Sequence, residues 1–289
     1  MNKPKGIVFD MDGVLRVGNN PIPHACDIIN IMIKNNIPGM VSTNECRYTE
    51  KVLRKELINM GINIPKNWAI YTAAMAVKDY LFKKIKKNIN KYYTIGIIGE
   101  DGLKKSMNSL NKLYNCSINN KPINDNSYKI LVIGAVNKIK IKDLERGLQW
   151  INSGAKIITT CCDTTDPSSK GDFNLGMPSH ILHLLKYNAR SINQYSLGKP
   201  HPIFRDKIIK EFENIPMKDL LFVGDTLYTD IKLAEESNMM SCLVLSGNSK
   251  LETLSKYIIE PDMVVNSVWD LKDLIEKKKG YLNFLNLFI

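Results

Sequence analysis

The stretch "IVFDMDGVLRV", residues 7–17, is an apolar run that stops abruptly at two aspartates, Asp10 and Asp12. Side chains two residues apart can turn to the same side of a strand, and Gly13 permits a sharp exit. Two carboxylates about 4 Å apart repel by about 4 kcal/mol at an effective dielectric near 20, so the pair requires a cation, a proton or both. An EF-hand loop is excluded because its later oxygen ligands and closing Glu are missing. A turn with solvated aspartates remains the alternative.

Apolar runs like this one recur along the chain and alternate with helical patterns, which predicts strand-helix units and a largely parallel sheet. Predicted strands cover residues 5–10, 38–43, 68–72, 92–99, 128–135, 155–160, 219–225 and 240–246. A helix is expected over 46–60, ending before Gly61, and another over 203–212, where Phe204, Ile208 and Phe212 repeat at four-residue spacing.

The chain of 289 residues is long enough for one large or two modest domains. The basic segment 82–91 lacks a strong apolar stripe and predicts a helix end followed by a connector, at which a second domain could begin. The Asn-rich segment 115–127 is expected to be a loop inside that domain.

The formal charge of +11 invites comparison with nucleic-acid-binding proteins. Only 6 of the 40 basic residues are Arg, however, and the remainder are Lys spread along the chain, so a nucleic-acid partner is not expected. The six cysteines follow no framework spacing, which predicts reduced thiols and a cytoplasmic location. No run reaches the roughly 18 apolar residues of a membrane span, and the terminal 281–289 is expected to be a packed or frayed tail.

Three further short sites follow strands, where ligands of open parallel sheets bind. Ser42-Thr43-Asn44 offers a hydroxyl and an amide at a helix start, although helix capping alone would explain these residues. Lys199 lies in a stiff connection between Gly198 and Pro200 and could neutralise a phosphate, although a lone Lys is usually a solvated charge.

The last site, "LLFVGDTLYTDI", repeats the first pattern, since an apolar strand ends at Asp225, and Asp230 follows near a helix start that it could cap. Asp10, Asp12, Asp225 and Asp230 together carry four negative charges against the single Lys199, and a phosphate dianion would add two more. Such a site requires a divalent cation, and an all-oxygen ligand set suits Mg²⁺ better than Zn²⁺.

These motifs, "DMDGVL", "STN", "GKP" and "GDTLYTD" in that order, resemble those of haloacid-dehalogenase-superfamily phosphatases. The chain is most similar to the NagD-like, p-nitrophenylphosphatase branch, which includes phosphoglycolate and pyridoxal phosphatases. The resemblance covers nearly the whole chain. It implies an α/β fold: a Rossmann-like parallel sheet core over residues 1–86 and 185–289, interrupted by an inserted α/β cap domain over 87–184.

The resemblance also implies roles for the site residues. Asp10 would be the nucleophile that forms an aspartyl-phosphate, and Asp12 would donate and then accept the proton. Mg²⁺ would be held by the Asp10 carboxylate, the Asp12 backbone carbonyl and Asp225. The substrate phosphate would be bound by Thr43, the Asn44 amide and Lys199, while Asp230 would support Lys199 or the metal.

One part of the expected cap departs from the pattern of the branch. Where related chains carry an Asn-Pro-Asp type stretch, this sequence reads Cys161, Cys162 and Asp163, in a loop expected to face the substrate. Asp163 can keep a polar contact, but a cysteine cannot replace both the donor and the acceptor of an amide. Zinc binding by Cys161 and Cys162 with His180 and His183 is a further alternative, although the spacing is not a known tetrahedral pattern.

The sequence therefore predicts a magnesium-dependent phosphatase that acts on a small phosphorylated metabolite. A phosphotransferase or mutase on the same scaffold is the alternative enzyme, and a non-catalytic nucleic-acid binder is the alternative from another class. A dehalogenase needs neither a second acid nor a metal, which argues against that reaction. The identity of the metabolite stays open, and a homodimer formed through the cap is expected from the resemblance.

Overall fold

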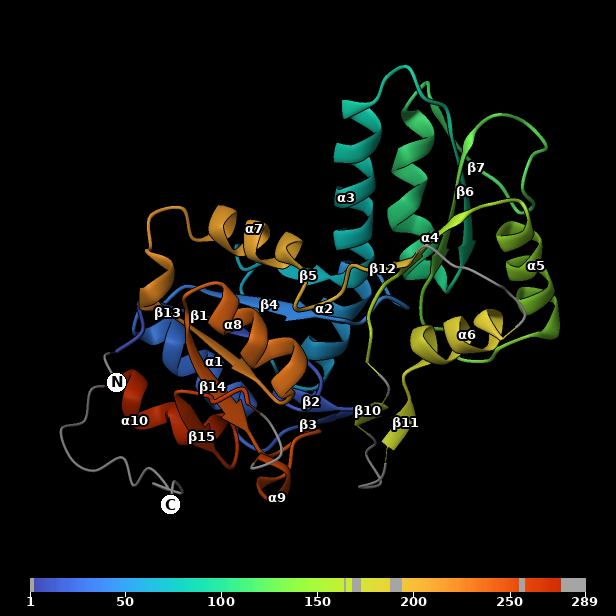
Figure 1. Cartoon of the computed structure of the whole chain (residues 1–289). Helices are drawn as coiled ribbons and strands as arrows, with labels where there is room; N and C mark the ends of the chain where they lie inside the picture. The colour runs from blue at the N-terminus through green and yellow to red at the C-terminus, as the bar shows by residue number, and fades with distance from the viewer. Residues whose placement is uncertain (1–2, 164, 168–172, 188–193, 255–257, 277–289) are drawn as a thin grey trace.

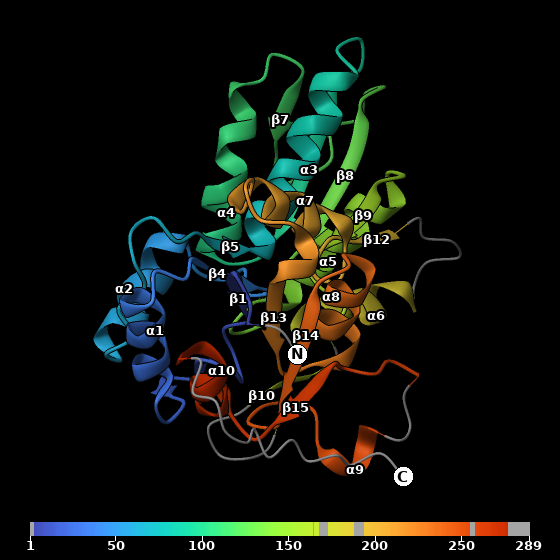
Figure 2. The same ribbon diagram turned by 90° about the vertical axis from the view of Figure 1, so that its left-hand side faces the viewer.

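Two parallel sheets make up the framework of the computed structural model, which describes residues 3–163, 165–167, 173–187, 194–254 and 258–276. The six-stranded sheet has the order β15-β14-β13-β1-β4-β5 and the five-stranded sheet has the order β12-β9-β8-β6-β7. All strand pairs within these two sheets are parallel. Figures 1 and 2 show the two sheets as separate units, with α3 rising from the first toward the second.

The strands of the six-stranded sheet are β1 (Gly6–Phe9), β4 (Gly39–Thr43), β5 (Ile70–Thr72), β13 (Leu220–Gly224), β14 (Met240–Val244) and β15 (Met263–Val265). Those of the five-stranded sheet are β6 (Tyr93–Ile98), β7 (Cys116–Ile118), β8 (Tyr128–Ile133), β9 (Lys156–Thr159) and β12 (Gln194–Ser196). Two antiparallel hairpins pair β2 (Arg16–Val17) with β3 (Asn20–Pro21) and β10 (Thr165–Pro167) with β11 (Phe173–Leu175).

The α-helices are α1 (Ala25–Lys34), α2 (Glu50–Asn59), α3 (Ala73–Lys87), α4 (Asp101–Asn108), α5 (Ile141–Asn152), α6 (Met177–Lys186), α7 (Pro202–Glu211), α8 (Lys232–Glu236), α9 (Leu251–Leu254) and α10 (Lys272–Glu276). Short 3₁₀ turns cover Ser109–Lys112, Met217–Asp219 and Val268–Leu271, and a π-helical turn covers Leu227–Ile231. Among the described residues, no helix is both long and apolar enough to cross a membrane.

Helices cover both faces of each sheet, which explains why the central strands β1 and β13 carry no polar side chain. In β1, Ile7 and Phe9 pack with α1, α2 and α10, whereas Val8 points into the cluster on the opposite face. The strands of the second sheet divide in the same way: Ile130 packs with α3 and α4, and Leu131 packs with α5 and α6. The predicted Rossmann-like α/β core is therefore confirmed.

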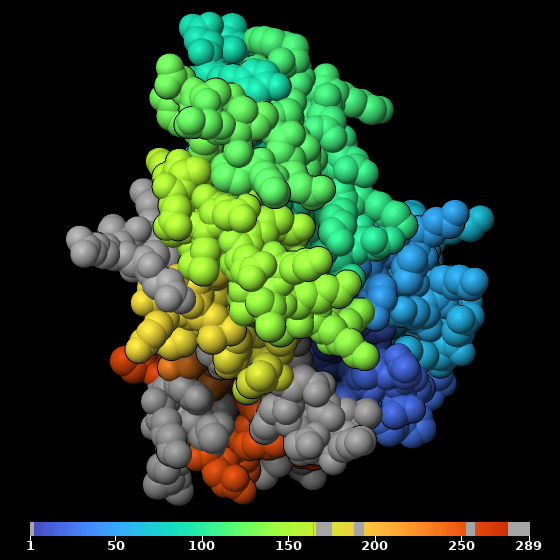
Figure 3. Space-filling model, turned by 90° about the vertical axis from the view of Figure 1, so that its right-hand side faces the viewer, coloured from blue at the N-terminus to red at the C-terminus, as the bar shows by residue number. Residues whose placement is uncertain are grey.

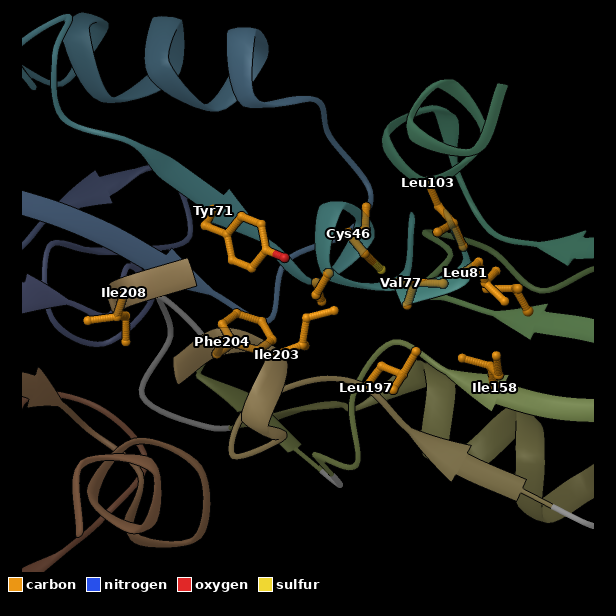
Figure 4. Close-up of a cluster of buried hydrophobic side chains, with 14 of the residues drawn as sticks. Cys46, Tyr71, Val77, Leu81, Leu103, Ile158, Leu197, Ile203, Phe204 and Ile208 are labelled. Carbon is orange, nitrogen blue, oxygen red and sulfur yellow. The ribbon is translucent and has the colours of Figure 1, made fainter. Parts of the chain in front are cut away.

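One apolar cluster joins the two sheets. It contains Tyr71, Phe204 and Ile208 from the first sheet and its helices, together with Leu103 and Ile158 from the second (Figure 4). In the space-filling view of Figure 3, the green surface of the second sheet and its helices lies against the blue surface of the N-terminal segment. The continuous core holds the second sheet close to the carboxyl ends of β1 and β4.

All eight predicted strands are present. The sequence analysis missed β7, β12 and β15 of the two parallel sheets and all four hairpin strands. Each of these strands is two or three residues long, and so short a run carries little periodicity. The expected loop at 115–127 thus contains an edge strand, and β12 extends the second sheet beyond the boundary expected at residue 184. The division into three chain segments stays a prediction. The expected terminal tail at 281–289 lies outside the described residues.

Of the two predicted helices, the one over 203–212 is confirmed as α7, with Phe204, Ile208 and Phe212 buried. The helix expected over 46–60 begins only at Glu50, where the Thr49 side chain caps it. Residues 46–49 stay outside the helix because the Glu45 carboxylate accepts hydrogen bonds from the backbone N–H groups of the two residues that follow it. The helix ends as expected before Gly61, whose φ is +84°.

Candidate active site

Three neighbouring strands deliver polar side chains to one edge of the six-stranded sheet. Asp10 follows β1, Thr43 ends β4 and Asp225 follows β13, and β1 lies between the other two strands. The register pairs Phe9 with both Val41 and Val223, so the strands end at nearly the same level. The parallel arrangement thus brings together residues that are far apart in the sequence, as the strand-end rule predicts.

Lys199 is the central cation of this edge. Its Nζ donates hydrogen bonds to Asp10 Oδ1 at 2.6 Å, to Asp230 Oδ1 at 2.7 Å and to the Ser42 carbonyl at 3.1 Å. Burial by itself lowers the pKa of Lys199, but the two carboxylates outweigh burial and the net effect raises it. The Lys199 side chain is 2% exposed, so it is a fixed buried charge rather than the solvated surface Lys of the alternative interpretation.

Asp230 is held on both of its carboxylate oxygens. While Oδ1 accepts from Lys199, Oδ2 accepts from the backbone N–H groups of Asp225 and Thr226, each at 3.2 Å. The π-helical turn over Leu227–Ile231 returns this side chain to the strand end. Asp230 therefore links the Lys199 ammonium to the backbone that carries Asp225, and it does not cap the next helix, whose N-cap is Ile231.

The Asp225 carboxylate packs directly against two glycines, Gly13 and Gly247. Its Oδ1 accepts from the Thr226 hydroxyl at 2.9 Å, and its Oδ2 accepts from the Asn248 backbone N–H at 2.7 Å. A Cβ at Gly13 would come within 2.2 Å of Asp225 Oδ2, and one at Gly247 within 2.0 Å. Both positions therefore exclude any side chain, which keeps the Asp225 carboxylate against the strand end.

The carboxylates of Asp10, Asp225 and Asp230 fit a divalent cation. One oxygen of each can be chosen so that all three atoms lie within 4.8 Å of one another, and all three residues are buried. Burial raises the pKa of Asp10 well above its ordinary value, and burial together with the Asp230 charge raises the pKa of Asp225 to about 7. A cation among these acids would relieve both effects, and an all-oxygen cluster suits a hard ion such as Mg²⁺.

Asp12 was expected in the metal set through its carbonyl, and its carboxylate lies outside this cluster. Its side chain accepts a hydrogen bond from Arg16 Nε at 3.0 Å, and Arg16 in turn donates to Glu56 Oε2 at 2.7 Å. Burial raises the pKa of Asp12, and Arg16 offsets part of this increase. The Asp12 carboxyl is thus placed at the same pocket as Asp10, with a pKa shifted toward holding a proton.

Thr43 and Asn44 lie beside Lys199. Thr43 Oγ1 accepts a hydrogen bond from the Glu45 backbone N–H at 3.0 Å, which leaves the hydroxyl hydrogen for another acceptor. The Asn44 side chain connects two parts of the chain, because its Oδ1 accepts from the Lys199 backbone N–H and its Nδ2 donates to Asp163 Oδ2, each at 2.8 Å. The sequence analysis expected the Asn44 amide to bind phosphate and did not anticipate that the Asn44 side chain bridges Asp163 and Lys199.

Within the loop after β9, Cys161 and Asp163 both face the pocket, whereas Cys162 is exposed. Burial raises the pKa of Asp163, which accepts the hydrogen bond from Asn44. The zinc alternative finds no support in the described part of the chain, where the group of possible metal ligands consists of aspartates alone. No disulfide bond joins any of the six cysteines, all of which lie in the described part of the chain.

These residues line one pocket of about 540 Å³ between the two sheets. Its walls include Asp10, Asp12, Thr43, Asn44, Cys161, Asp163, Lys199 and Asp225. They also include residues that the sequence reading missed: Arg16, Glu45, Arg47, Glu56 and Asn248. The two arginines could have been singled out from the sequence, because Arg is scarce in this chain: it has only 6, and two of them line this pocket.

Comparisons with known proteins find similar sequences over most of the chain. Residues 7–111 match the family model of haloacid dehalogenase-like hydrolases, and residues 196–271 match a second, HAD-hydrolase-like model. The chain is 27% identical to dihydroxyacetone phosphatase from Corynebacterium glutamicum, over 91% of this chain and 89% of that protein. It is 25% identical to the ribonucleotide monophosphatase NagD of Escherichia coli, over 92% and 98% of the two chains.

Solved structures show the same fold. A hypothetical protein from Pyrococcus horikoshii superposes with a TM-score of 0.76 at 29% identity, covering 94% of this chain and 98% of that one. A p-nitrophenyl phosphatase from Archaeoglobus fulgidus superposes with a TM-score of 0.76 at 22% identity, covering 96% and 100%. The similarity therefore extends over both sheets and not only over the strand ends that carry the acids.

Proposed function

Because the chain belongs to the haloacid-dehalogenase-like hydrolases, we propose that it is a phosphatase that hydrolyses a small phosphomonoester through an aspartyl-phosphate. One observation supports this most directly. Asp10 faces the pocket with Oδ1 held by Lys199, while no hydrogen bond from a described residue reaches its Oδ2. A carboxylate held by one oxygen and open on the other is suited to attack phosphorus.

In the proposed reaction, an oxygen of Asp10 forms a bond to phosphorus as the bond between phosphorus and the leaving oxygen breaks. Asp12 gives its proton to that oxygen, so the product leaves as an alcohol. Asp12 then takes a proton from water as the water oxygen attacks phosphorus, and the Asp10 carboxylate is released together with inorganic phosphate. The raised pKa of Asp12 supports this role, since a proton carrier works best when its pKa lies nearer to neutral pH.

Phosphate binding falls to the groups around Asp10. The Lys199 ammonium and the Thr43 hydroxyl hydrogen are positioned to neutralise and orient the phosphoryl oxygens, and Asn44 holds the Lys199 backbone in place. We assign Asp230 to positioning Lys199, because both of its oxygens are already bonded within the protein. Asp163 positions Asn44 from the loop after β9.

Mg²⁺ is the proposed cofactor, and Asp10 and Asp225 would hold it, joined by the Asp12 carbonyl and supported by Asp230. When bound, the ion would neutralise charge on the phosphoryl group and on the acids around it.

We further propose that the second sheet and its helices act as a cap over the site. A homodimer formed through this cap and a cytoplasmic location are also proposed, because both follow the family pattern.

The direct test measures phosphate release from p-nitrophenyl phosphate by the full chain, first with EDTA and then with added Mg²⁺. Turnover should require Mg²⁺ and should disappear in Asp10→Asn, while Asp219→Asn, which alters a distant surface ion pair with Lys5, should behave as wild type. Turnover by Asp10→Asn at the wild-type rate would exclude the nucleophile assignment. Adding a sugar acceptor and comparing phosphorylated sugar with free phosphate distinguishes hydrolysis from phosphoryl transfer.

A further inference from the structure

The pocket that contains the proposed phosphate site has an acidic lining. Its lining contains six carboxyl groups and three cationic side chains. Asp10, Asp225 and Lys199 belong to the proposed phosphate and metal site. The remaining charged groups of the lining are four acids and two arginines: Asp12, Glu45, Glu56, Asp163, Arg16 and Arg47.

Arg16 is already committed to two carboxylates. Its Nε lies 3.0 Å from Asp12 Oδ1 and its Nη1 lies 2.7 Å from Glu56 Oε2, and its side chain is only 5% exposed. Two acids around one guanidinium leave a net negative charge on the group of three. Arg16 therefore brings no uncompensated positive charge to the pocket, because two acids already share the charge of its guanidinium.

Arg47 is compensated in a similar way. Its Nε donates to both oxygens of Glu45, at 3.0 Å each, and its Nη2 pairs with Glu45 Oε2. Glu45 is fixed in turn, because its Oε1 accepts the backbone N–H groups of Cys46 and Arg47 and its side chain is 2% exposed. The arginine thus neutralises a buried acid and adds no net positive charge to the pocket.

Asp163 contributes a further acid whose observed hydrogen-bond donor, the Asn44 amide, is neutral. Even with a proton on Asp12, this remaining part of the lining has three carboxylates and only two arginines. Neutral hydrogen-bonding groups are also present, since Asn137 and Thr165 line the same space. Tyr48 is the only aromatic side chain among the described lining residues, so a flat ring would find no pair of faces to stack between.

We propose that the substrate is a short phosphomonoester whose leaving group is uncharged and carries hydroxyl or carbonyl oxygens, and that esters bearing a carboxylate are discriminated against. This inference rests on the proposed phosphatase function and specifies its substrate class. Hydroxyl groups can bond to the acids and amides of the pocket, whereas a second anion would enter a field that repels it.

The test compares two esters that differ at one carbon. Glycerol 3-phosphate ends in a CH₂OH group where 3-phosphoglycerate ends in a carboxylate, and the rest of the three-carbon chain is the same. With Mg²⁺ held constant, kcat/KM for glycerol 3-phosphate should exceed that for 3-phosphoglycerate by about tenfold or more, and added salt should reduce the ratio. Equal values, or a preference for the carboxylate, would overturn the proposal.

A charge variant tests the physical reason. Glu56→Gln removes one acid and leaves Arg16 with a single carboxylate partner, so kcat/KM for 3-phosphoglycerate should rise by about threefold or more relative to glycerol 3-phosphate. Glu211→Gln is the matched control, because Glu211 pairs with Lys207 on α7, outside the pocket lining, and it should leave the ratio unchanged. An unchanged ratio in Glu56→Gln would contradict the electrostatic origin.

Different results would exclude the proposed substrate class and the proposed phosphatase function on which it rests. If none of these esters and no p-nitrophenyl phosphate is hydrolysed, the proposed function fails. Isothermal titration calorimetry of glycerol 3-phosphate and 3-phosphoglycerate with the Mg²⁺-loaded protein then decides the inference alone. Tighter binding of glycerol 3-phosphate supports it, and equal or tighter binding of 3-phosphoglycerate overturns it.

Discussion

Replacing Lys199 with Met should destabilise the fold as well as abolish activity, because this ammonium holds two buried acids together. Its Nζ lies 2.6 Å from Asp10 Oδ1 and 2.7 Å from Asp230 Oδ1, and the side chain is 2% exposed. Methionine nearly matches the length of the lysine stem, so the substitution mainly removes the charge and the hydrogen bonds. The acids then remain buried without their cation.

The expected cost follows from these distances. Each pair contributes a Coulomb attraction of about 6 kcal/mol at an effective dielectric of about 20, and the desolvation of the lysine offsets much of the sum. Removal of one partner from a buried pair typically costs about 3–5 kcal/mol of unfolding free energy. Repulsion between the remaining carboxylates places the expected loss toward the upper end of that range.

Urea unfolding followed by far-UV circular dichroism, with EDTA present, measures this loss. The matched control is Lys5→Met, which removes a lysine 2.8 Å from Asp219 but at a position where the side chain is 66% exposed. Such surface pairs contribute about 0–1 kcal/mol, so the control should unfold almost as the wild type does. Equal losses in Lys199→Met and Lys5→Met would refute the reasoning that burial makes Lys199 essential.

Three other perturbations probe the site. Gly247→Ala places a Cβ about 2.0 Å from the present position of Asp225 Oδ2, so the carboxylate must move, and we expect kcat/KM to fall by about 100-fold together with weaker Mg²⁺ binding in titration calorimetry. Asp163→Ala removes the acceptor of the Asn44 amide and should raise KM by about five- to tenfold. Asp163→Asn keeps an acceptor oxygen and should change KM less. Equal KM values for the two variants would contradict the positioning role. In the native protein iodoacetamide should label the exposed Cys162 before the four buried cysteines, as mass spectrometry of peptides can show, and early labelling of a buried cysteine would contradict the packing.

Local sequence was sufficient to predict the strand ends. The run before Asp10 and the run before Asp225 are apolar at every position because both faces of their sheet are covered, and a polar residue directly after such a run must lie at its edge. All eight predicted strands exist for this reason, while β12, a three-residue strand with exposed side chains, left no pattern to detect.

The helix expected from residue 46 failed for a different reason. An apolar period continues through this segment, but the buried Glu45 carboxylate takes the first two backbone N–H groups, and the Cys46 side chain accepts from Ala135 and Thr160 of the second sheet. The two contacts of the Cys46 side chain join residues 89 and 114 positions apart in the chain. Periodicity within a short window carries no information about them.

By itself, then, the sequence determined which acids follow buried strands, because strand burial follows from local pattern, whereas Lys199 was singled out by its position between Gly198 and Pro200 and not by a predicted strand. Tertiary structure alone decided the partners of each group: Asp230 bonded on both oxygens, Arg16 shared between Asp12 and Glu56, and Asn44 linked to Asp163 across the two sheets. The physical reason is that pairing depends on distances between side chains on different elements. Those distances set the charge balance of the pocket, and so the kind of substrate that it can admit.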